Sequence, residues 1–488
     1  MAAIITEKFR VHNAKQFKED FGESASSTYV FIGRSHPWPT DTSPPTPVNG
    51  TSETVDSWSD MTALKKVGSA DVSHGLTRYD WTSGVTYDEY AHDISATNTS
   101  SGSNATSLFA SKFYVMTDEY HVYKCLRTGR ATGGATVAST VKPTGTSATA
   151  LVETADTGAT QYGYLWKYMY TVTASDTIKF VTNDFIPVKT IGAKAEIDGT
   201  SGALGTTASD DGSSQWDVEN NAVNGGVHHA IVTAKGSGYN NGDGAYENVP
   251  IVGDGSGGVC TVHVSGNQVT HITITNPGTG YRNAQIIIAT STSGLSGIGG
   301  GSGAVVKCVI SPQIGHGADP IQELGGNHVI VNSRLEFGEG SGDFPTDNDF
   351  RRIGLIQDPF STGTTVATAS SMAAYHQMTV SDASDLSVDD IIRSNGTDAA
   401  GVANSRIVSI TGNVVSHIPI ADTAGGFTNF AATNNVFLGN SNKGTVSSVN
   451  AAFPEVVKHS GQILYVENRG AVTRAADQIE DIKLIIEM

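Results

Sequence analysis

Short apolar runs separated by polar, glycine-rich turns recur along the whole chain. Thr28–Gly33, Gly163–Val172 and Ile482–Ile486 are rich in branched and aromatic residues and have the length of strands. Gly412-Asn413 lies between two alternating runs and predicts a hairpin turn. The pattern therefore predicts a protein built mainly from β-strands.

The stretch His459–Met488 contains two apolar runs, Ile463–Val466 and Ile482–Ile486, on either side of a charged connector. Asn468-Arg469-Gly470 has the composition of a turn, so we expect two strands joined at this point. Because chain ends that are not tied down fray, we expect these strands to complete a domain begun near the N-terminus.

Helical spacing is confined to short segments. A strand predicted over Ile4–Val11 is followed by a helix candidate over Asn13–Phe21, where Asn13 can cap the first turn. Val55–Val67 presents Trp58, Met61 and Leu64 as one helical face. We therefore expect few and short helices.

An internal repeat occupies the glycine-rich stretch from Gly225 to Gly303. Its two Gly-x-Gly-Tyr elements end at Tyr239 and Tyr281, 42 residues apart. Each unit has the pattern of short strands joined by glycine turns, with the tyrosine packing against its neighbour. Two copies are too few for a long solenoid, so a small β-sandwich or stacked β-module is expected.

The charge balance of the chain excludes two classes of partner. The chain has 30 Lys and Arg against 48 Asp and Glu, a formal net charge of −18. Nucleic-acid binding needs clustered positive charge, and so does binding to an anionic membrane surface. Neither nucleic acid nor membrane is therefore expected as a partner.

The three cysteines, Cys125, Cys260 and Cys308, are widely spaced and contain no Cys-x-x-Cys pair. An odd number at such spacing does not indicate a disulfide framework. We expect them to be buried small apolar residues, which suits assembly in a reducing cytoplasm. Neither a signal peptide nor an apolar run of membrane-spanning length is expected.

No motif nominates catalytic or cofactor-binding residues. The chain has no Gly-x-x-x-x-Gly-Lys-Ser/Thr loop and no Gly-x-Ser-x-Gly elbow. Adjacent His228 and His229 would point to opposite faces of a strand, which makes them poor co-ligands, and His316 with Asp319 is the other pair considered. No catalytic residue, cofactor or metal ligand is predicted from these patterns.

A calcium site near Asp343–Asp349 is left open. Asp343, Asp347 and Asp349 supply the oxygen ligands that Ca²⁺ takes, but their spacing departs from an EF-hand and the expected glycine is missing. A solvated loop is the favoured interpretation.

Seven sequence blocks, including both ends of the chain, occur in an order that resembles the baseplate wedge proteins of T-even-type contractile-tail bacteriophages, specifically the dimeric outer-wedge subunit. The most distinctive are a Gly-Arg-Ser-x-Pro-Trp type of signature at Gly33–Trp38 and the His-Ser-Gly, Glu-Asn-Arg and Asp-Gln elements near the C-terminus. The blocks are Ile4–Arg10, Phe31–Trp38, Val122–Leu126, Tyr164–Tyr168, Asn183–Ile186, Phe350–Pro359 and His459–Met488.

The resemblance covers residues 1–190, 344–360 and 455–488, about half of the chain. The intervening stretches, about 195–343 and 362–452, have no clear counterpart. The chain is similar to an expanded version of the family, of the sort seen in phages of marine cyanobacteria.

Together the patterns and the resemblance predict a mainly β, multi-domain protein with a β-sandwich-like core, inserted small β-domains and few short helices. The expected parts are a wedge core over 1–194, a Gly-rich β-repeat insert over 195–343, a return segment over 344–361, a second small β-domain over 362–454, and C-terminal strands completing the core over 455–488.

The resemblance implies a structural, non-enzymatic role in the tail baseplate of the virion, after assembly in the host cytoplasm. It also implies a homodimer that contacts other baseplate wedge proteins, holds them in place and permits rearrangement when the tail sheath contracts. The alternative is a tail adhesin that binds host-surface carbohydrate through the inserted β-domains. A polysaccharide-degrading tail enzyme would need two positioned acids, and the sequence selects no such pair.

Four motif positions, Arg34, Trp38, Tyr465 and Arg469, are the candidate interface residues because arginine and large aromatic residues are enriched at binding hot spots. The competing interpretation for each is core packing or an ion pair, such as Arg469 with Glu467 or Asp477. That second interpretation is favoured.

Overall fold

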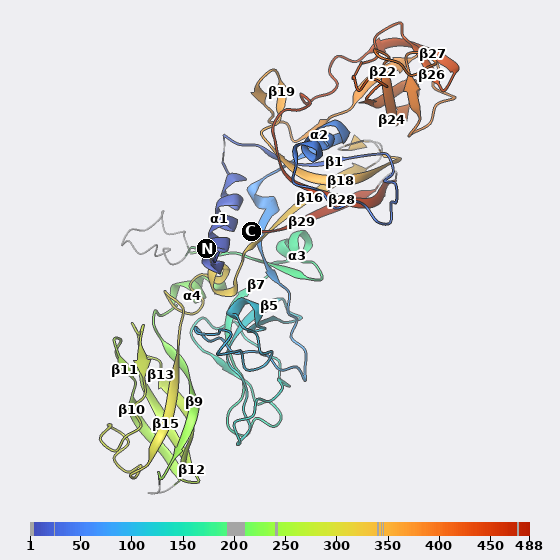
Figure 1. Cartoon of the computed structure of the whole chain (residues 1–488). Helices are drawn as coiled ribbons and strands as arrows, with labels where there is room; N and C mark the ends of the chain where they lie inside the picture. Colours follow the sequence, from blue (N-terminus) through green and yellow to red (C-terminus); the bar gives the residue numbers. More distant parts are fainter. Residues whose placement is uncertain are drawn as a thin grey trace. The chain divides into compact units, whose positions relative to one another are not determined.

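The computed structural model describes residues 4–23, 25–192, 210–239, 243–338, 341–342, 344, 346–475 and 478–488. The protein is mainly β with several sheets, a small barrel and short helices, so the predicted fold class is confirmed (Figure 1). Its contacts divide it into two compact units: a first unit of residues 1–15, 73–329 and 486–488, and a second unit of residues 16–72 and 330–485. The boundaries of the five expected parts stay a prediction.

A five-stranded antiparallel sheet forms the centre of the second unit. Its strand order is β21-β2-β1-β18-β28, so strands from both ends of the sequence belong to one sheet, with β18 between β1 and β28 (Figure 1). Tyr29, Phe31, Leu64 and Ile356 are buried from this sheet, and Trp58 packs against them. The strands are β21 (Ser371–Ala373), β2 (Met61–Val67), β1 (Thr28–Gly33), β18 (Asn348–Gln357) and β28 (Gln462–Arg474), and the helix that precedes β2 is α2 (Thr51–Asp60).

Two further groups of strands belong to the second unit. Strand β16 (His328–Gly338) pairs with β17 (Ser341–Gly342) and with β29 (Ile479–Glu487). The short strands β19 (Phe360–Thr362) and β20 (Thr365–Val366) form a separate hairpin.

The second unit also contains a closed six-stranded barrel with the order β22-β25-β24-β23-β26-β27. Met378, Ile392, Ile407 and Val415 fill its interior. Gly412 and Asn413 join two neighbouring strands of the barrel, as the sequence predicts. The strands are β22 (His376–Val380), β23 (Ile391–Arg393), β24 (Asn404–Thr411), β25 (Val414–Ile420), β26 (Asn435–Leu438) and β27 (Ser441–Val449).

The first unit is built around a four-stranded sheet of order β4-β5-β7-β6 and a pairing of β3 with β8. Tyr123, Tyr164, Trp166 and Tyr168 are buried from this sheet, which explains the aromatic run noted in the sequence. The elements are β3 (Val72–Thr77), β4 (Tyr114–Met116), β5 (His121–Arg127), β6 (Val152–Glu153), β7 (Leu165–Thr171), β8 (Phe185–Val188), α3 (Ala174–Phe180), α4 (Ser214–Asn220) and α5 (Pro320–Leu324).

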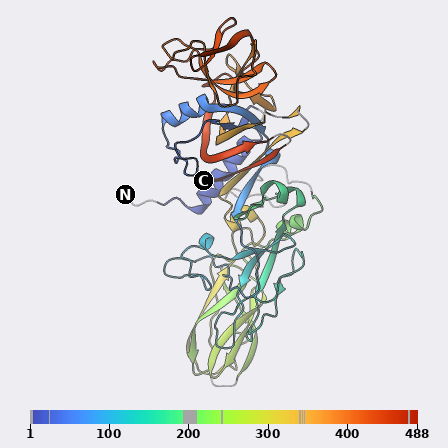
Figure 2. The same ribbon diagram turned by 90° about the vertical axis from the view of Figure 1, so that its right-hand side faces the viewer.

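The glycine-rich repeat folds as a β-module of the first unit, in which β9 pairs with β15 and a second sheet has the order β10-β12-β13 (Figures 1 and 2). Both repeat tyrosines are buried, and their hydroxyls accept hydrogen bonds from backbone N–H groups, Tyr239 from Ala304 and Tyr281 from Gly258. They pack the module, as the repeat predicts. The strands are β9 (Val227–Ser237), β10 (Gly244–Pro250), β11 (Val252–Gly253), β12 (Val259–Ser265), β13 (Gln268–Asn276), β14 (Ala284–Gln285) and β15 (Ser302–Ile310).

The N-terminal strand expected over Ile4–Val11 is wrong. Helix α1 (Glu7–Asp20) begins within this segment. Val11 and Ala14 are buried at helical spacing, while Ile4, Ile5 and Phe9 stay exposed. The apolar residues that suggested a strand therefore do not fill a sheet.

Two other local predictions are also corrected. The turn expected at Asn468-Arg469-Gly470 is absent, because β28 continues through it and pairs Asn468 with Arg352 and Val472 with Phe350 on β18. The helix expected over Val55–Val67 stops at Asp60, where Met61 begins a strand that pairs with β1. In both places pairing across the sheet decides the backbone conformation.

Candidate functional site

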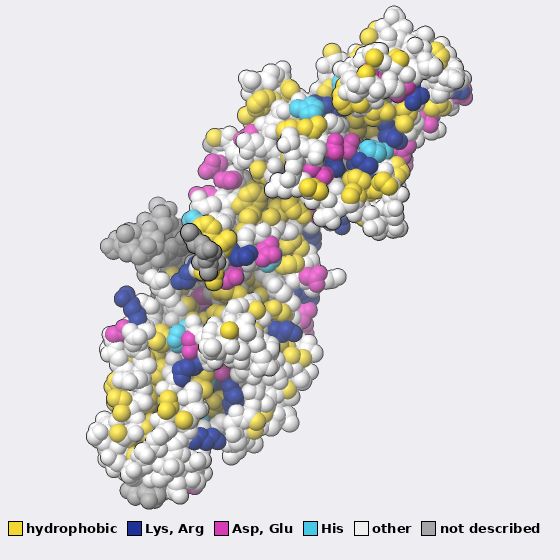
Figure 3. Space-filling model, in the orientation of Figure 1, with side chains coloured by type: hydrophobic (Ala, Val, Ile, Leu, Met, Phe, Trp, Pro, Cys, Tyr) yellow, Lys and Arg dark blue, Asp and Glu magenta, His cyan; other side chains and the backbone are white. Residues whose placement is uncertain are grey.

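Three of the sequence blocks meet on the central sheet of the second unit. Arg34 directly follows β1, Arg351 and Arg352 lie on β18, and Arg469 lies on β28. These strands are neighbours in the sheet, so residues far apart in sequence share one site. We call these four arginines, with Trp38, the arginine cluster. Figure 3 shows basic and acidic side chains side by side over α2 and the strands next to it.

Trp38 lies at the centre of the cluster and is buried. The guanidinium carbon of Arg34 lies 3.6 Å from the centroid of the Trp38 ring, and that of Arg352 lies 5.7 Å away. The indole Nε1 donates a hydrogen bond of 2.8 Å to the backbone carbonyl of Arg469. Trp38 thereby connects the loop after β1 to the edge strand β28, with cation–π attraction adding to its packing.

Arg351 holds the loop that contains Trp38. Its Nε lies 3.1 Å from both carboxylate oxygens of Asp41, and its Nη2 lies 3.0 Å from the same carboxylate and 2.9 Å from Asp349. Its Nη1 donates to the carbonyl of Ser35. Paired bonds between one guanidinium and one carboxylate are among the stronger polar interactions in proteins.

Arg352 connects β18 to α2 and to β28. It donates to Glu53 at 2.7 Å, to Asp60 at 3.4 Å and to the side chain of Asn468 at 3.0 Å. Asp60 also accepts a hydrogen bond of 3.4 Å from Arg34. Because Asp60 serves two arginines, the pairs form a connected network.

The electrostatics follow from this arrangement. The hydrogen bond from Arg351 lowers the pKa of Asp41. Burial raises the pKa of Asp60, against the opposing effect of Arg352 and Arg34. Burial and then the charge of Arg34 lower the pKa of His36 to about 4, so His36 is neutral at pH 7. The cluster therefore holds its positive charge on the arginines.

The outer side of the cluster is accessible. Arg469 lies 3.4 Å from Glu467, and their side chains are 46% and 36% exposed. The Tyr465 hydroxyl donates to Glu467 at 3.1 Å, and burial raises the pKa of Tyr465 to about 12. Asp477, the other acid considered for Arg469, lies outside the described residues.

All four candidate interface residues thus belong to this one region, and their role at an interface stays a prediction. Arg351, Arg352 and Asp41 contribute more bonds to it but are not among the predicted residues. Two adjacent arginines inside a strand of apolar residues are a usable signal, because buried arginines require acidic partners.

A second polar cluster lies inside the first unit. Lys124 and Glu323 form a buried ion pair of 2.8 Å, and the Lys124 amine lies 4.1 Å from the centroid of the Tyr90 ring. His316 and His228 lie beside it with ring centroids 5.3 Å apart. Burial lowers the pKa of Lys124 and raises that of Glu323. With the nearby Lys167, we call this group the lysine–histidine cluster.

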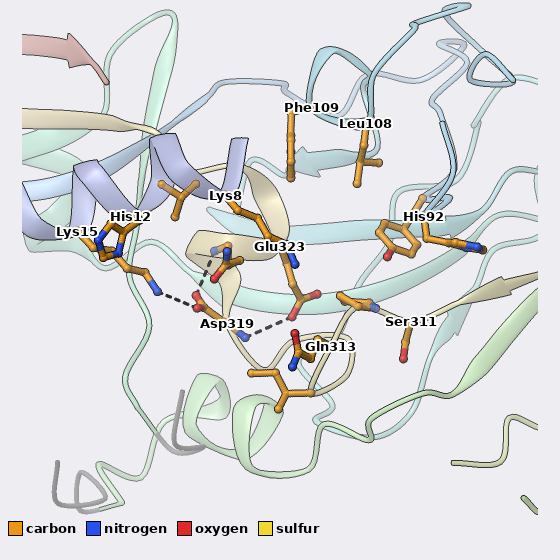
Figure 4. A pocket seen from close by; sticks show the side chains of 15 residues that line it. Lys8, His12, Lys15, His92, Leu108, Phe109, Ser311, Gln313, Asp319 and Glu323 are labelled. Carbon is orange, nitrogen blue, oxygen red and sulfur yellow. Dashed lines mark hydrogen bonds and ion pairs between the residues drawn. The ribbon is translucent and has the colours of Figure 1, made fainter. Parts of the chain in front are cut away.

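A pocket of about 840 Å³ opens beside this cluster (Figure 4). Helix α1 contributes Lys8, His12 and Lys15 on one side, and Leu108 and Phe109 lie on another. Its two acids are already paired, since Asp319 binds Lys15 at 2.9 Å and Glu323 binds Lys124. This arrangement offers a groove of mixed polarity and nominates no catalytic group.

The residues considered for metal binding lie apart. His229 faces Glu89 at 3.5 Å, whereas His228 faces His316, so the adjacent histidines point to different surroundings. Asp349 is bound by Arg351, and Asp343 lies outside the described residues. Across the described ranges, no group of three or more His, Cys, Asp or Glu residues is placed to hold a metal ion. Within the same ranges, no helix has the length and apolarity to cross a membrane.

Comparison with known proteins gives a match for the part of the chain that contains the block Phe31–Trp38. Residues 3–199 match the family model described as "Bacteriophage T4, Gp8". The resemblance to the baseplate wedge family is confirmed here. The chain is also similar to "Baseplate wedge protein gp8" of Enterobacteria phage T4, with 28% identity over 211 residues, 38% of this chain. The match spans 60% of the length of that relative.

The family match includes Arg34, Trp38, Asp41 and Asp60 but ends well before β18 and β28. The structure therefore joins a region with gp8-like sequence to strands outside the matched residues. The resemblance of the later blocks, around Arg352 and Arg469, stays a prediction.

Proposed function

We propose that the protein is a structural, non-enzymatic subunit of the baseplate wedge of a contractile phage tail, and that it acts in the virion after assembly in the host cytoplasm. The observation that carries the proposal is the match of residues 3–199 to the gp8 family model. The mainly β fold and the absence of a nominated catalytic group among the described residues agree with it.

The proposed subunit is a homodimer that also contacts other wedge proteins. The accessible edge of the arginine cluster, Tyr465, Glu467 and Arg469 on β28, is the proposed contact surface. Arg34, Arg351 and Arg352 are held inside the network, so they position this edge and do not themselves reach a partner. Arginine at a partly buried centre is favoured at protein interfaces.

The adhesin alternative has less support. It requires exposed aromatic residues on the inserted module, and both repeat tyrosines, Tyr239 and Tyr281, are buried. A carbohydrate platform built on these two residues is therefore not available.

The test of the dimer uses two matched arginine variants. Arg469 and Arg334 have side chains 46% and 47% exposed, and each is ion-paired with an acid, Glu467 at 3.4 Å and Asp481 at 3.1 Å. Light scattering during size-exclusion chromatography should give twice 50.9 kDa for the wild type. We expect Arg469→Glu to give a monomer and Arg334→Glu to stay dimeric. A stable trimer would point away from a wedge subunit.

The most detailed part of the proposal is that the contacts of this edge with other wedge proteins rearrange when the tail sheath contracts. Glu467 accepts a hydrogen bond from Tyr465 and is ion-paired with Arg469, so a partner can replace one of these contacts without leaving the acid unpaired. Such exchangeable contacts suit an interface with two packings. Chemical cross-linking of intact particles before and after contraction should change the cross-links at this edge; identical cross-links would exclude it from the moving interface.

A further inference from the structure

A second pocket, of about 440 Å³, lies within the second unit. Its walls come from the barrel and from the segment that precedes β28, and they include His376, Pro419, Phe427, Asn429, Lys458 and His459. None of the described residues that line it is Asp or Glu, although the chain carries 48 acidic residues.

Lys458 is the single lysine or arginine among the described lining residues, and its charge has no carboxylate bound to it directly. Its amine donates to the carbonyl of Ser59 at 3.3 Å. The charge of Asp60 acts on the pKa of Lys458, but Asp60 is itself ion-paired with Arg34 and Arg352. A partly buried ammonium group without an anionic partner is costly, and an incoming carboxylate would remove that cost.

His376 does not compete for this role at neutral pH. Burial, and then the charge of Lys458, lower the pKa of His376 to about 4. Burial likewise lowers the pKa of Lys458 to about 8, against the opposing effect of Asp60, so the amine is still mainly protonated at pH 7. Lys458 therefore supplies a positive charge to the pocket.

Apolar side chains form one part of the lining, beside the polar Ser59, Ser361 and Asn429 and the two histidines. The side chain of Phe427 is 61% exposed, and Val457, Pro419 and Pro454 belong to the same apolar part. An exposed phenylalanine in a pocket with one lysine is suited to an anion that carries an apolar group.

The backbone that carries Lys458 is held in place before any ligand arrives. Val457 donates to the carbonyl of Phe360 at 2.8 Å, and the Ser460 hydroxyl accepts from the N–H of Phe360 at 2.9 Å. The His459 ring packs against Trp58 with centroids 5.5 Å apart. A binding site fixed in this way loses little conformational entropy on binding.

We propose that this pocket receives an Asp or Glu side chain, together with an adjoining apolar residue, from a neighbouring protein of the assembled particle. Charge complementarity and the exposed apolar wall define the occupant. The source of the carboxylate rests on the function proposed above, whereas the recognition of a carboxylate does not.

The chemistry is tested on the purified full-length chain with two small probes. Phenylacetate and phenylacetamide have the same ring and nearly the same shape, and they differ in charge. Saturation-transfer NMR should show phenylacetate binding about ten times more tightly, a difference of about 1.4 kcal/mol. Lys458→Gln should abolish this preference, and Phe427→Ser should weaken both probes.

The matched control is Lys443→Gln. Lys443 lies on the barrel strand β27 and, unlike Lys458, is ion-paired with a carboxylate, that of Asp385 at 3.0 Å. This variant should keep the tenfold preference. Circular dichroism checks that each variant is folded. Equal binding of the two probes, or an unchanged preference in Lys458→Gln, would overturn the site. Binding of glucuronate as tightly as phenylacetate would assign the pocket to an acidic sugar and overturn the protein occupant.

The occupant is tested in assembled particles with a photoreactive benzoylphenylalanine in place of Phe427, and in place of the exposed Val48 as a control. We expect cross-links from position 427 to a peptide in which Asp or Glu adjoins an apolar residue. Assembled particles without such a cross-link would refute the occupant. A chain that enters no particle would refute the proposed function and this source of carboxylate, while the probe measurements would still decide the chemistry.

Discussion

The arginine cluster of the second unit and the lysine–histidine cluster of the first unit solve the problem of buried charge in different ways. In the arginine cluster, Arg351 and Arg352 are each bound to two acids, and Asp60 is shared between two arginines. In the lysine–histidine cluster, Glu323 is the acid paired with Lys124, and both side chains are buried.

The two clusters differ in the surroundings of the charges that remain after one charged residue is substituted. A network with shared partners leaves each remaining charge with another ion or with water, because Asp41 and Arg469 are partly exposed. In the solitary pair of Lys124 and Glu323, loss of the amine leaves the buried carboxylate with the backbone N–H groups of Gly317 and Asp319, which carry no full charge, in a medium that solvates it poorly. We therefore expect the solitary pair to be the more sensitive to substitution and the shared network to be the more tolerant.

The largest effect is expected from Lys124→Met. Removing the amine leaves Glu323 buried without its cation, which should lower the free energy of unfolding by about 3–5 kcal/mol. Denaturation by urea measures the change. The control is Lys142→Met, whose partners Asp118 and Glu119 are exposed, so a much smaller loss is the expected result. Equal losses in the two variants would remove the distinction between the clusters.

A smaller loss is expected from Arg351→Lys. Lysine keeps the charge but cannot form the paired bonds to Asp41, so the free energy of unfolding should fall by about 1–2 kcal/mol. Arg334→Lys, at an exposed ion pair, should cost less than about 0.5 kcal/mol. A loss as large as that of Lys124→Met would show that the network offers no tolerance.

Each cluster has a partly buried histidine whose pKa is lowered to about 4, His36 beside the arginines and His228 beside Lys124, and His228 serves to measure the response to acid. Burial lowers the pKa of His228 to about 4, below its value of about 6.5 in an unfolded chain. The unfolded state therefore gains a proton first, and stability falls as the pH decreases from about 6.5 to about 4. His228→Asn should reduce the loss of unfolding free energy between pH 7 and pH 5 by about 1–2 kcal/mol.

The Asp41 carboxylate of the arginine cluster gives a different pH window. Its pKa lies below 3.8 because of the bond from Arg351, so its stabilising contribution is present above that pH and is lost only as the pH falls below it. Asp41→Asn should leave the change in stability between pH 7 and pH 5 unaltered. A changed pH dependence in this variant would show that Asp41 titrates in the same range as the histidines.

The smallest loss of stability among the substitutions in the arginine cluster is expected from Trp38→Phe. The ring remains available to Arg34, but the bond from Nε1 to the carbonyl of Arg469 is lost, which should cost about 1 kcal/mol. Thermal unfolding measures it. Trp81→Phe is a suitable control because its Nε1 also makes one bond, to Ser139, away from the arginine cluster; a much smaller loss there would show that the bond to β28 matters more than an average one.

The parts of the fold that the sequence predicts are those set by local chemistry. Thr28–Gly33 is a strand with the predicted ends, and Gly412-Asn413 forms the predicted hairpin turn. Within the predicted strand Ile4–Val11, the residues from Glu7 onward are helical because the apolar residues of this segment do not meet a sheet, and its composition does not reveal this. Asn468-Arg469-Gly470 stays within β28 because β18 pairs with Asn468 and Val472 on either side of a register shift, and such pairing depends on a strand more than a hundred residues earlier in the chain.

The same limit applies to the arginine cluster: its unusual residues can be selected from the sequence, but their contacts cannot. Arg34, Trp38 and Arg469 could be selected as unusual residues in distinctive blocks. Their contact depends on β1, β18 and β28 being neighbours, and no local pattern orders strands so distant in sequence. The carboxylates that complete the network, Asp41 and Asp60, lie in segments whose composition resembles any polar loop or helix end.

The position of β28 at the edge of the central sheet has a consequence for synthesis of the protein. A ribosome delivers β1, β2 and β18 long before residues 462–474, so until then β18 presents an unpaired edge along its length. Unpaired edges invite pairing with other chains. A chain without β28 would keep this edge open and leave the Trp38 indole without its acceptor. The strand of this sheet that is synthesised last thus protects β18 from pairing with other chains.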